Sequence, residues 1–185
     1  MMPRVMILLA AVGLAAPACG DTSGPHNGNG NEDRGSFQAT ASGDLNLSFS
    51  GEAVFGIQTA DGSSAFVIAL MHGTLGGDNS DYVFIGRDNT TAPGAGTYPI
   101  HPSTCGSCTA DDFTAAYLHQ VTVVDYGVFF SDTGAFTISA ASADTLRGTF
   151  DLTTSAFLTI GSVTADSVRL QGTFTAVAGQ VPSAP

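Results

Sequence analysis

Two cysteines three positions apart, Cys105 and Cys108, are the residues of this sequence best suited to chemistry. They lie in the stretch HPSTCGSCTADD, which runs from residue 101 to residue 112. Such a pair can be a redox couple, part of a metal site or a local disulfide. A redox couple needs a stabilised thiolate, whereas Asp111 and Asp112 would destabilise one. No strand-helix-strand pattern elsewhere would build the usual redox scaffold, so this interpretation is disfavoured.

A metal site would recruit the two histidines that flank the cysteine pair. His101 and His119 complete a His-x3-Cys-x2-Cys-x10-His set, and four ligands of these types suit tetrahedral zinc. A single Cys-x-x-Cys is a weak signal for zinc, because the strong signal is two such pairs. Attachment of haem is excluded, since Thr109 stands where the histidine of Cys-x-x-Cys-His belongs.

A local disulfide between Cys105 and Cys108 is the interpretation that the cysteine count favours. The chain has three cysteines, and they divide into this pair and Cys19 near the N-terminus. An exported protein meets an oxidising environment, which favours a disulfide over zinc thiolates. Closing so small a ring stabilises the fold by about 2 kcal/mol in the chain-entropy model. We therefore expect the pair to pin a long loop.

An acidic turn offers a second candidate metal site. Asp78, Asn79 and Asp81 in GGDNSDY carry oxygen ligands of the kind that calcium uses. Their spacing misses the pattern of an EF-hand loop, and Asp and Asn are also ordinary turn-forming residues. Calcium is therefore a secondary expectation at this turn.

Catalytic signatures are missing from the sequence. It contains no Gly-x-Ser-x-Gly, no His-Glu-x-x-His and no phosphate-binding Gly-x4-Gly-Lys, which would need a lysine. Glu52 is the one glutamate between residues 35 and 178, so a glycosidase would have to work with aspartates. The sequence predicts no catalytic residue and no enzyme.

The N-terminus has the organisation of an export signal. Arg4 precedes an uncharged apolar run from residue 5 to residue 16, which is too short to span a bilayer as a helix. The following Ala16-Pro17-Ala18-Cys19 contains an Ala-x-Ala site for ordinary signal peptidase, and it also resembles the lipobox of bacterial lipoproteins. That resemblance implies cleavage after residue 18, acylation of Cys19, and attachment to the outer membrane or cell surface. We therefore expect a signal peptide over 1–18 and, over 19–34, a lipidated cysteine with a flexible polar linker.

The charge balance limits the partners. After residue 18 the chain has four arginines, no lysine and sixteen Asp plus Glu, a net charge of 4 − 16 = −12. Such a chain repels nucleic acid and anionic lipid. Membrane attachment must therefore come from acyl chains, and no nucleic-acid partner is expected.

Alternation of apolar and polar residues identifies the folded part as β-sheet. Between residues 37 and 57 the apolar side chains occupy odd positions, with Val54 as the main exception: Phe37, Ala39, Ala41, Leu45, Leu47, Phe49, Ala53, Phe55 and Ile57. A period of two over twenty residues indicates strands with one buried face. Residues 42–44 are predicted to be a three-residue hairpin turn, and Gly51 to mark a bulge or bend.

The C-terminal half contains an internal repeat that indicates successive hairpins. Residues 136–150 and 158–174 share an Ala-Asp-Thr/Ser-Leu/Val-Arg core followed by Gly-Thr-Phe, at an offset of 22 residues. Turn-rich segments separate further short strands, whereas residues 179–185 are predicted to be a disordered tail. The sequence thus predicts one all-β domain over 35–178, an antiparallel sandwich or barrel of about eight to ten strands.

The repeated Gly-Thr-Phe/Tyr strands at 96–98, 148–150 and 172–174 resemble those of small secreted bacterial lipoproteins of unknown function. The resemblance supports the fold rather than an activity. We expect a lipid-anchored, non-enzymatic envelope protein with a binding or structural role. The alternative is an envelope metal-binding or thiol-redox protein that uses Cys105 and Cys108 with His101 and His119. A carrier of apolar ligands would require a roomy barrel interior.

Overall fold

Nine β-strands make up the folded part of the chain. The computed structural model describes residues 35–60 and 62–182. The strands are β1 (Ser36–Gly43), β2 (Leu47–Ala60), β3 (Ser63–His72), β4 (Ser80–Arg87), β5 (Gly96–Ile100), β6 (Thr114–Thr122), β7 (Asp125–Ala141), β8 (Thr145–Ile160) and β9 (Ser167–Ala178). Within the described ranges there is no helix long and apolar enough to cross a membrane. The predicted signal peptide, Cys19 and linker lie outside these ranges.

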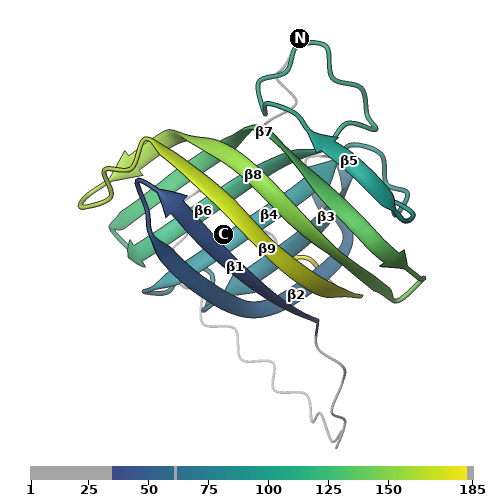
Figure 1. Ribbon diagram of the computed structural model, residues 1–185, viewed down its shortest axis with the longest axis horizontal. Helices are drawn as coiled ribbons and strands as arrows, with labels where there is room; N and C mark the ends of the chain where they lie inside the picture. The colour runs from purple at the N-terminus through teal and green to yellow at the C-terminus, as the bar shows by residue number, and fades with distance from the viewer. Residues whose placement is uncertain (1–34, 61, 183–185) are drawn as a thin grey trace, which may run out of the picture.

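Eight of the strands close into an antiparallel barrel (Figure 1). Neighbours in the chain pair with each other from β1 to β4 and from β6 to β9, β4 pairs with β6, and β9 returns to pair with β1. The seam between β1 and β9 runs from Ser36 opposite Thr175 to Gly43 opposite Val168. The sequence did not distinguish a sandwich from a barrel. The closed ring of strand pairings shows that the fold is a barrel.

The long strand β7 has two different neighbours along one of its edges. Its first half pairs with β6, where Phe129 lies opposite Tyr117. Its second half pairs with β5, where Phe136 lies opposite Tyr98. The connection from β5 to β6, which contains both cysteines, therefore begins and ends beside the same strand. This arrangement fixes the two ends of the disulfide loop.

The interior of the barrel is filled with apolar side chains. The odd positions of β1 and β2 point inward, as the alternation predicts, and Phe37, Phe49 and Phe55 are buried there. Tyr117 and Phe129 stack at 5.6 Å between ring centroids in the middle of the core. Eight strands enclose just enough room for side chains of this size. These bulky residues leave little room in the interior, whereas an apolar-ligand carrier requires a roomy one.

The outer face of β3 and β4 is apolar as well. Both strands are nearly continuous apolar runs, the pattern of strands that are covered on both faces. Val67 and Tyr82 on this outer side are buried, and Val181 from the C-terminal segment packs against the same cluster. The Gly179 amide also donates to the Phe55 carbonyl at 3.0 Å. The predicted disordered tail is thus wrong for residues 179–182, because an apolar outer face accepts them.

Two details of the first hairpin differ from the sequence prediction. The turn between β1 and β2 falls at residues 44–46 rather than 42–44, with Ala41 opposite Leu47. Pairing continues through Gly51 without a register shift, so Gly51 is not a bulge. A side chain at Gly51 would collide with the carbonyl oxygen of Met71. The glycine therefore permits the close approach of β3.

Because the strands alternate in direction, the turns gather at two opposite ends of the barrel. The hairpin end carries residues 44–46, 73–79, 123–124 and 161–166, which connect β1 to β2, β3 to β4, β6 to β7 and β8 to β9. The disulfide end carries the two other hairpin turns, the connection from β4 to β6, and the start of β1.

Candidate functional site

The loop that holds the two cysteines is anchored to the barrel by one buried hydroxyl. Ser131 of β7 donates from Oγ to the His101 carbonyl at 2.7 Å and accepts from the Ala115 amide at 3.0 Å. Its own carbonyl accepts the Ser103 amide at 3.1 Å. The hydroxyl and the carbonyl of this buried serine thus both have hydrogen-bond partners. Because these partners lie before and after the cysteine pair, the loop is fixed on both sides of it.

Cys105 and Cys108 are joined as a disulfide, with their Cα atoms 5.5 Å apart. The geometry fits the predicted local staple, since the Cα separation is in the usual range. The Cys105 amide donates to the Pro102 carbonyl at 3.0 Å, which makes the tight turn that brings the sulfur atoms together. In this form the sulfur atoms are not thiolates, and thiolates are what zinc requires.

Part of the predicted zinc set is nevertheless brought together. Ligand atoms of His101, Cys105 and Cys108 lie within 4.8 Å of one another, and Asp112 Oδ1 is 3.6 Å from His101 Nε2. If the disulfide is reduced, two sulfurs and one imidazole are available, with a carboxylate beside them. His119 does not belong to this group, because it lies on β6 in a different cluster.

His119 instead contacts Asp81, a residue that the sequence assigned to calcium. The carboxylate oxygen Asp81 Oδ1 accepts a hydrogen bond from Tyr117 Oη at 2.7 Å and from His119 Nδ1 at 2.8 Å. Asp81 lies opposite His119 in the pairing of β4 with β6, and both point into the barrel near its hairpin end. Tyr117 is fully buried, and burial, together with the Asp81 charge, raises its pKa.

The predicted calcium ligands are separated by this arrangement. Asp81 is committed to Tyr117 and His119, whereas Asp78 stands exposed in the turn. Asn79 adopts a positive φ of 52° and donates its amide to the Val121 carbonyl, so it shapes the turn. Turn formation accounts for these residues. The Asp81–Tyr117–His119 cluster is what sequence reasoning missed, and an aspartate at an inward position of a strand was the signal for it.

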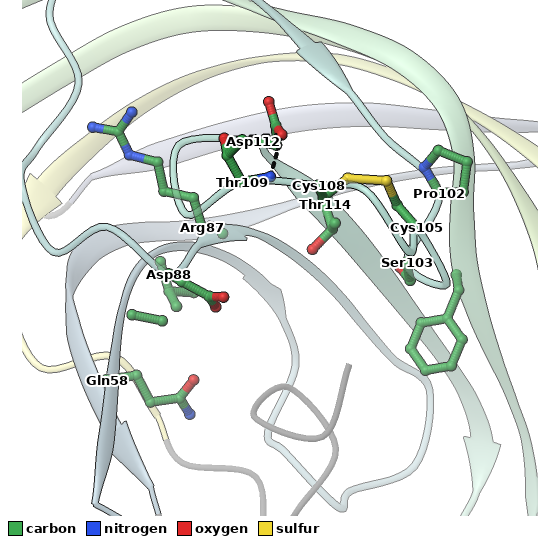
Figure 2. Close-up of a pocket in the computed structure, with 14 residues that line it drawn as sticks. Gln58, Arg87, Asp88, Pro102, Ser103, Cys105, Cys108, Thr109, Asp112 and Thr114 are labelled. Atoms are coloured by element: carbon green, nitrogen blue, oxygen red, sulfur yellow. Dashed lines mark hydrogen bonds between the residues drawn. A yellow bond between two sulfur atoms is a disulfide. The ribbon is translucent and has the colours of Figure 1, made fainter. Parts of the chain in front are cut away.

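A small pocket lies on the outer side of the barrel beside the disulfide (Figure 2). It has a volume of about 50 Å³, room for a few waters or one small chemical group. Gln58 and Asp88 point toward its centre, whereas the Arg87 side chain extends away from them. The Arg87 guanidinium lies over the Phe113 ring at 4.9 Å and donates to the Thr91 carbonyl at 2.7 Å. Arg87 therefore stabilises the connection between β4 and β6 and does not fill the pocket.

A larger hollow crosses the opposite, polar side of the barrel. The strands β1, β8 and β9 of that side face the viewer in Figure 1. The hollow spans β7, β8, β9, β1 and β2 and has a volume of about 810 Å³. We call it the polar groove. Its polar lining consists of hydroxyl and amide side chains and one carboxylate, namely Gln38, Thr40, Ser48, Ser50, Thr137, Thr149, Asp151, Gln171 and Thr173.

The single charge in the polar groove is neutralised by an arginine. Arg169 makes a two-point contact with Asp151, from Nε at 2.9 Å and from Nη2 at 2.7 Å. Gln171 Nε2 donates to the same carboxylate at 3.0 Å. The Arg169 hydrogen bond holds the pKa of Asp151 below its usual value. The groove is therefore uncharged overall and rich in hydrogen-bond donors and acceptors.

Register places the threonines of the groove in a row. Thr137 lies opposite Thr149, and Thr149 lies opposite Thr173, so three neighbouring strands present a hydroxyl at the same level. Thr97 of β5 extends the row, with its Oγ1 3.0 Å from that of Thr137. These residues belong to the Gly-Thr-Phe/Tyr repeats and to β7. The repeat thus builds a surface as well as a fold.

Comparison with known proteins finds no counterpart: no family model, no curated protein and no solved structure matches this chain.

Proposed function

We propose that this protein is a lipid-anchored, non-enzymatic binding module of the bacterial envelope. The apolar segment over 5–16 and the lipobox-like residues 16–19 support export and acylation of Cys19. In this proposal the domain is held at the membrane by acyl chains and presents its barrel to the surroundings. Replacing Cys19 by alanine should abolish incorporation of a labelled fatty acid. Labelling that persists in that variant contradicts the anchor.

The polar groove is the proposed binding site, and it is the observation that carries this function. The interior is filled, whereas the groove is an open hollow of about 810 Å³ on the outer face that carries no net charge. Rows of hydroxyl and amide groups at fixed strand spacing suit a neutral, polyhydroxylated ligand, since neighbouring strands offer hydrogen bonds at intervals of about 4.8 Å across the sheet. An extended polysaccharide is the ligand class with matching chemistry.

Binding can be tested with soluble oligosaccharides on the exported chain. Amide NMR spectra recorded with chitotetraose and cellotetraose should show shifts confined to residues of the groove. The Gln171→Ala variant should weaken binding by about five- to tenfold, the loss of one or two hydrogen bonds. The matched control is Gln180→Ala, an exposed glutamine outside the groove. Equal effects of the two variants, or no shifts with either sugar, contradict the proposal.

A second candidate function rests on the proximity of His101, Cys105 and Cys108. We propose, as the alternative, an envelope metal-binding or thiol-redox protein that works when the pair is reduced. Intact mass of the chain exported without reductant or chelator distinguishes the two functions. A mass two hydrogens light with no metal supports the disulfide staple. Reduced protein that retains zinc in native mass spectrometry, and loses it in His101→Ala, supports the alternative.

A further inference from the structure

Exposed apolar side chains gather at the hairpin end of the barrel. Six large apolar residues are strongly exposed among the described residues, and five of them lie here. Val123 and Val124 form the turn between β6 and β7 and are 64% and 66% exposed. Phe157, Leu158 and Ile160 occupy the last part of β8. We call these five residues the apolar tip.

The strand that carries three of these residues has one unpaired edge. Leu158 lies opposite Val128 and Ile160 lies opposite Tyr126, so this part of β8 pairs with β7. The pairing of β8 with β9 ends at Ser155 opposite Ser167. Beyond Ala156, whose amide donates to the Asp166 carbonyl, β8 has no ladder partner on its β9 side. Backbone donors and acceptors are therefore available along residues 157–160.

A register shift presents the largest of these side chains to the outside. The pairing of β7 with β8 shifts between Val128 and Phe129, which leaves Phe157 as the extra residue on β8. Phe157 is 65% exposed, and its ring lies 5.0 Å from that of Phe130 on the outer face. Bulges usually blunt a sheet edge, but this one places an aromatic ring beside it.

The apolar tip contains no charge on a strongly acidic protein. The carboxylate nearest to it in the chain, Asp125, turns back into the hairpin: Oδ1 accepts the Ser162 amide at 2.9 Å and Oδ2 accepts Thr122 Oγ1 at 3.2 Å. The chain as a whole has a formal net charge of −11. Two copies therefore repel each other over most of their surface, and they can approach most closely where charge is absent.

We propose that the apolar tip docks a second copy of this chain, edge to edge through residues 157–160 of β8. An antiparallel pairing of identical edges about a twofold axis satisfies the backbone groups of both copies and packs Phe157 and Ile160 of each against the other. A bilayer offers no backbone hydrogen bonds, and a strand edge left unpaired in lipid is unfavourable. A second strand is therefore the occupant that matches both the edge and its side chains.

The apolar area of the tip indicates the size class of this contact. At their observed exposures the five side chains present about 450 Å² of apolar surface per copy, so that a dimer buries about 900 Å². This is below the size of standard stable interfaces, so we expect a weak dimer that forms at micromolar to millimolar concentrations of about 5 µM to 1 mM. Since each copy contributes one such edge, the association closes at two copies.

Sedimentation velocity of the exported chain with Cys19→Ser, which removes any acyl group, tests the proposal. Between 5 µM and 1 mM the protein should pass from monomer to dimer, at lower concentrations in 0.5 M than in 0.1 M NaCl because salt screens the acidic surfaces. Phe157→Glu should raise the dimer Kd at least tenfold. The matched control is Ile57→Glu, since Ile57 is the sixth exposed apolar residue, is 48% exposed and lies outside the apolar tip.

Several outcomes would overturn the proposal. These are a monomer throughout the range, an equal effect of Ile57→Glu, or growth beyond the dimer. Flotation with neutral phosphatidylcholine vesicles that Phe157→Glu abolishes would assign the apolar tip to lipid. Thermal melting first checks that the variant is folded. Val124→Glu, at the turn itself, replaces it if Phe157→Glu is not folded.

Discussion

Replacing Tyr117 by phenylalanine should destabilise the barrel more than the same change at Tyr98, which is only partly buried. The Tyr117 hydroxyl donates to the buried Asp81 carboxylate at 2.7 Å. A hydrogen bond to a charged acceptor contributes about 1.5–3 kcal/mol, and its loss leaves Asp81 with the His119 proton as its remaining donor in this cluster. We expect a loss of about 2 kcal/mol in the free energy of unfolding.

The matched control is Tyr98→Phe. The Tyr98 hydroxyl donates to the neutral Gly94 carbonyl at 3.0 Å in an exposed position, while its ring stacks on Phe136 in both forms. Its loss should amount to about 0.5–1 kcal/mol. In urea unfolding without reductant, with a slope of about 2 kcal/mol/M, Tyr117→Phe should lower the midpoint by about 1 M.

Two results would refute this reasoning. The first is equal destabilisation by Tyr117→Phe and Tyr98→Phe, which would mean that the Asp81 charge adds nothing to the hydrogen bond. The second comes from the double variant with Asp81→Asn. Residues in one network should show a coupling energy of about 1 kcal/mol or more, so additive losses would mean that Tyr117 and Asp81 act independently.

Three other outcomes are expected. The raised pKa of Tyr117 means that the folded state keeps a proton that the unfolded state loses above about pH 10. The free energy of unfolding should therefore fall as the pH rises beyond about 10, and it should fall less in Tyr117→Phe. Urea midpoints recorded over this pH range measure the difference. Joint replacement of Cys105 and Cys108 by serine should lower the free energy of unfolding by about 2 kcal/mol, and an unchanged urea midpoint would contradict the staple. Gly161→Ala should lower the melting temperature by at least about 4 °C, because Gly161 has a φ of +72° and the new Cβ would collide with the Asp125 carboxylate. An unchanged melting temperature in calorimetry would disprove this contact.

The sequence could predict the strands because their pattern is local. The odd apolar positions from Phe37 to Phe55 do face the core, whereas Ile57 is exposed. The hairpins of the repeat have turns near Asp144 and Asp166 as expected. The alternating segment 114–122 is likewise a strand, β6. In each case the alternation lies within a few neighbouring residues, which is the information a single strand needs.

The sites were harder to predict because they depend on register between distant strands. Asp81 and His119 are 38 residues apart and were assigned to two different metals, yet they face each other across β4 and β6. Barrel closure likewise depends on the pairing of β1 with β9, which no local pattern specifies. The C-terminal residues 179–182 were predicted to be disordered because they follow the last recognisable strand, whereas the partner for Val181 is an outer sheet face formed far away in the chain.

The seam between β1 and β9 has a consequence for how the protein reaches its folded state. The first and last strands of the barrel are neighbours, and Ser36 lies opposite Thr175. The ring can therefore not close until nearly the whole domain is available, and contacts of such high sequence separation form slowly. A chain exported in unfolded form would remain open throughout its passage. Its last strand would complete the barrel only after crossing the membrane, so the protein would become compact in the compartment to which it is exported.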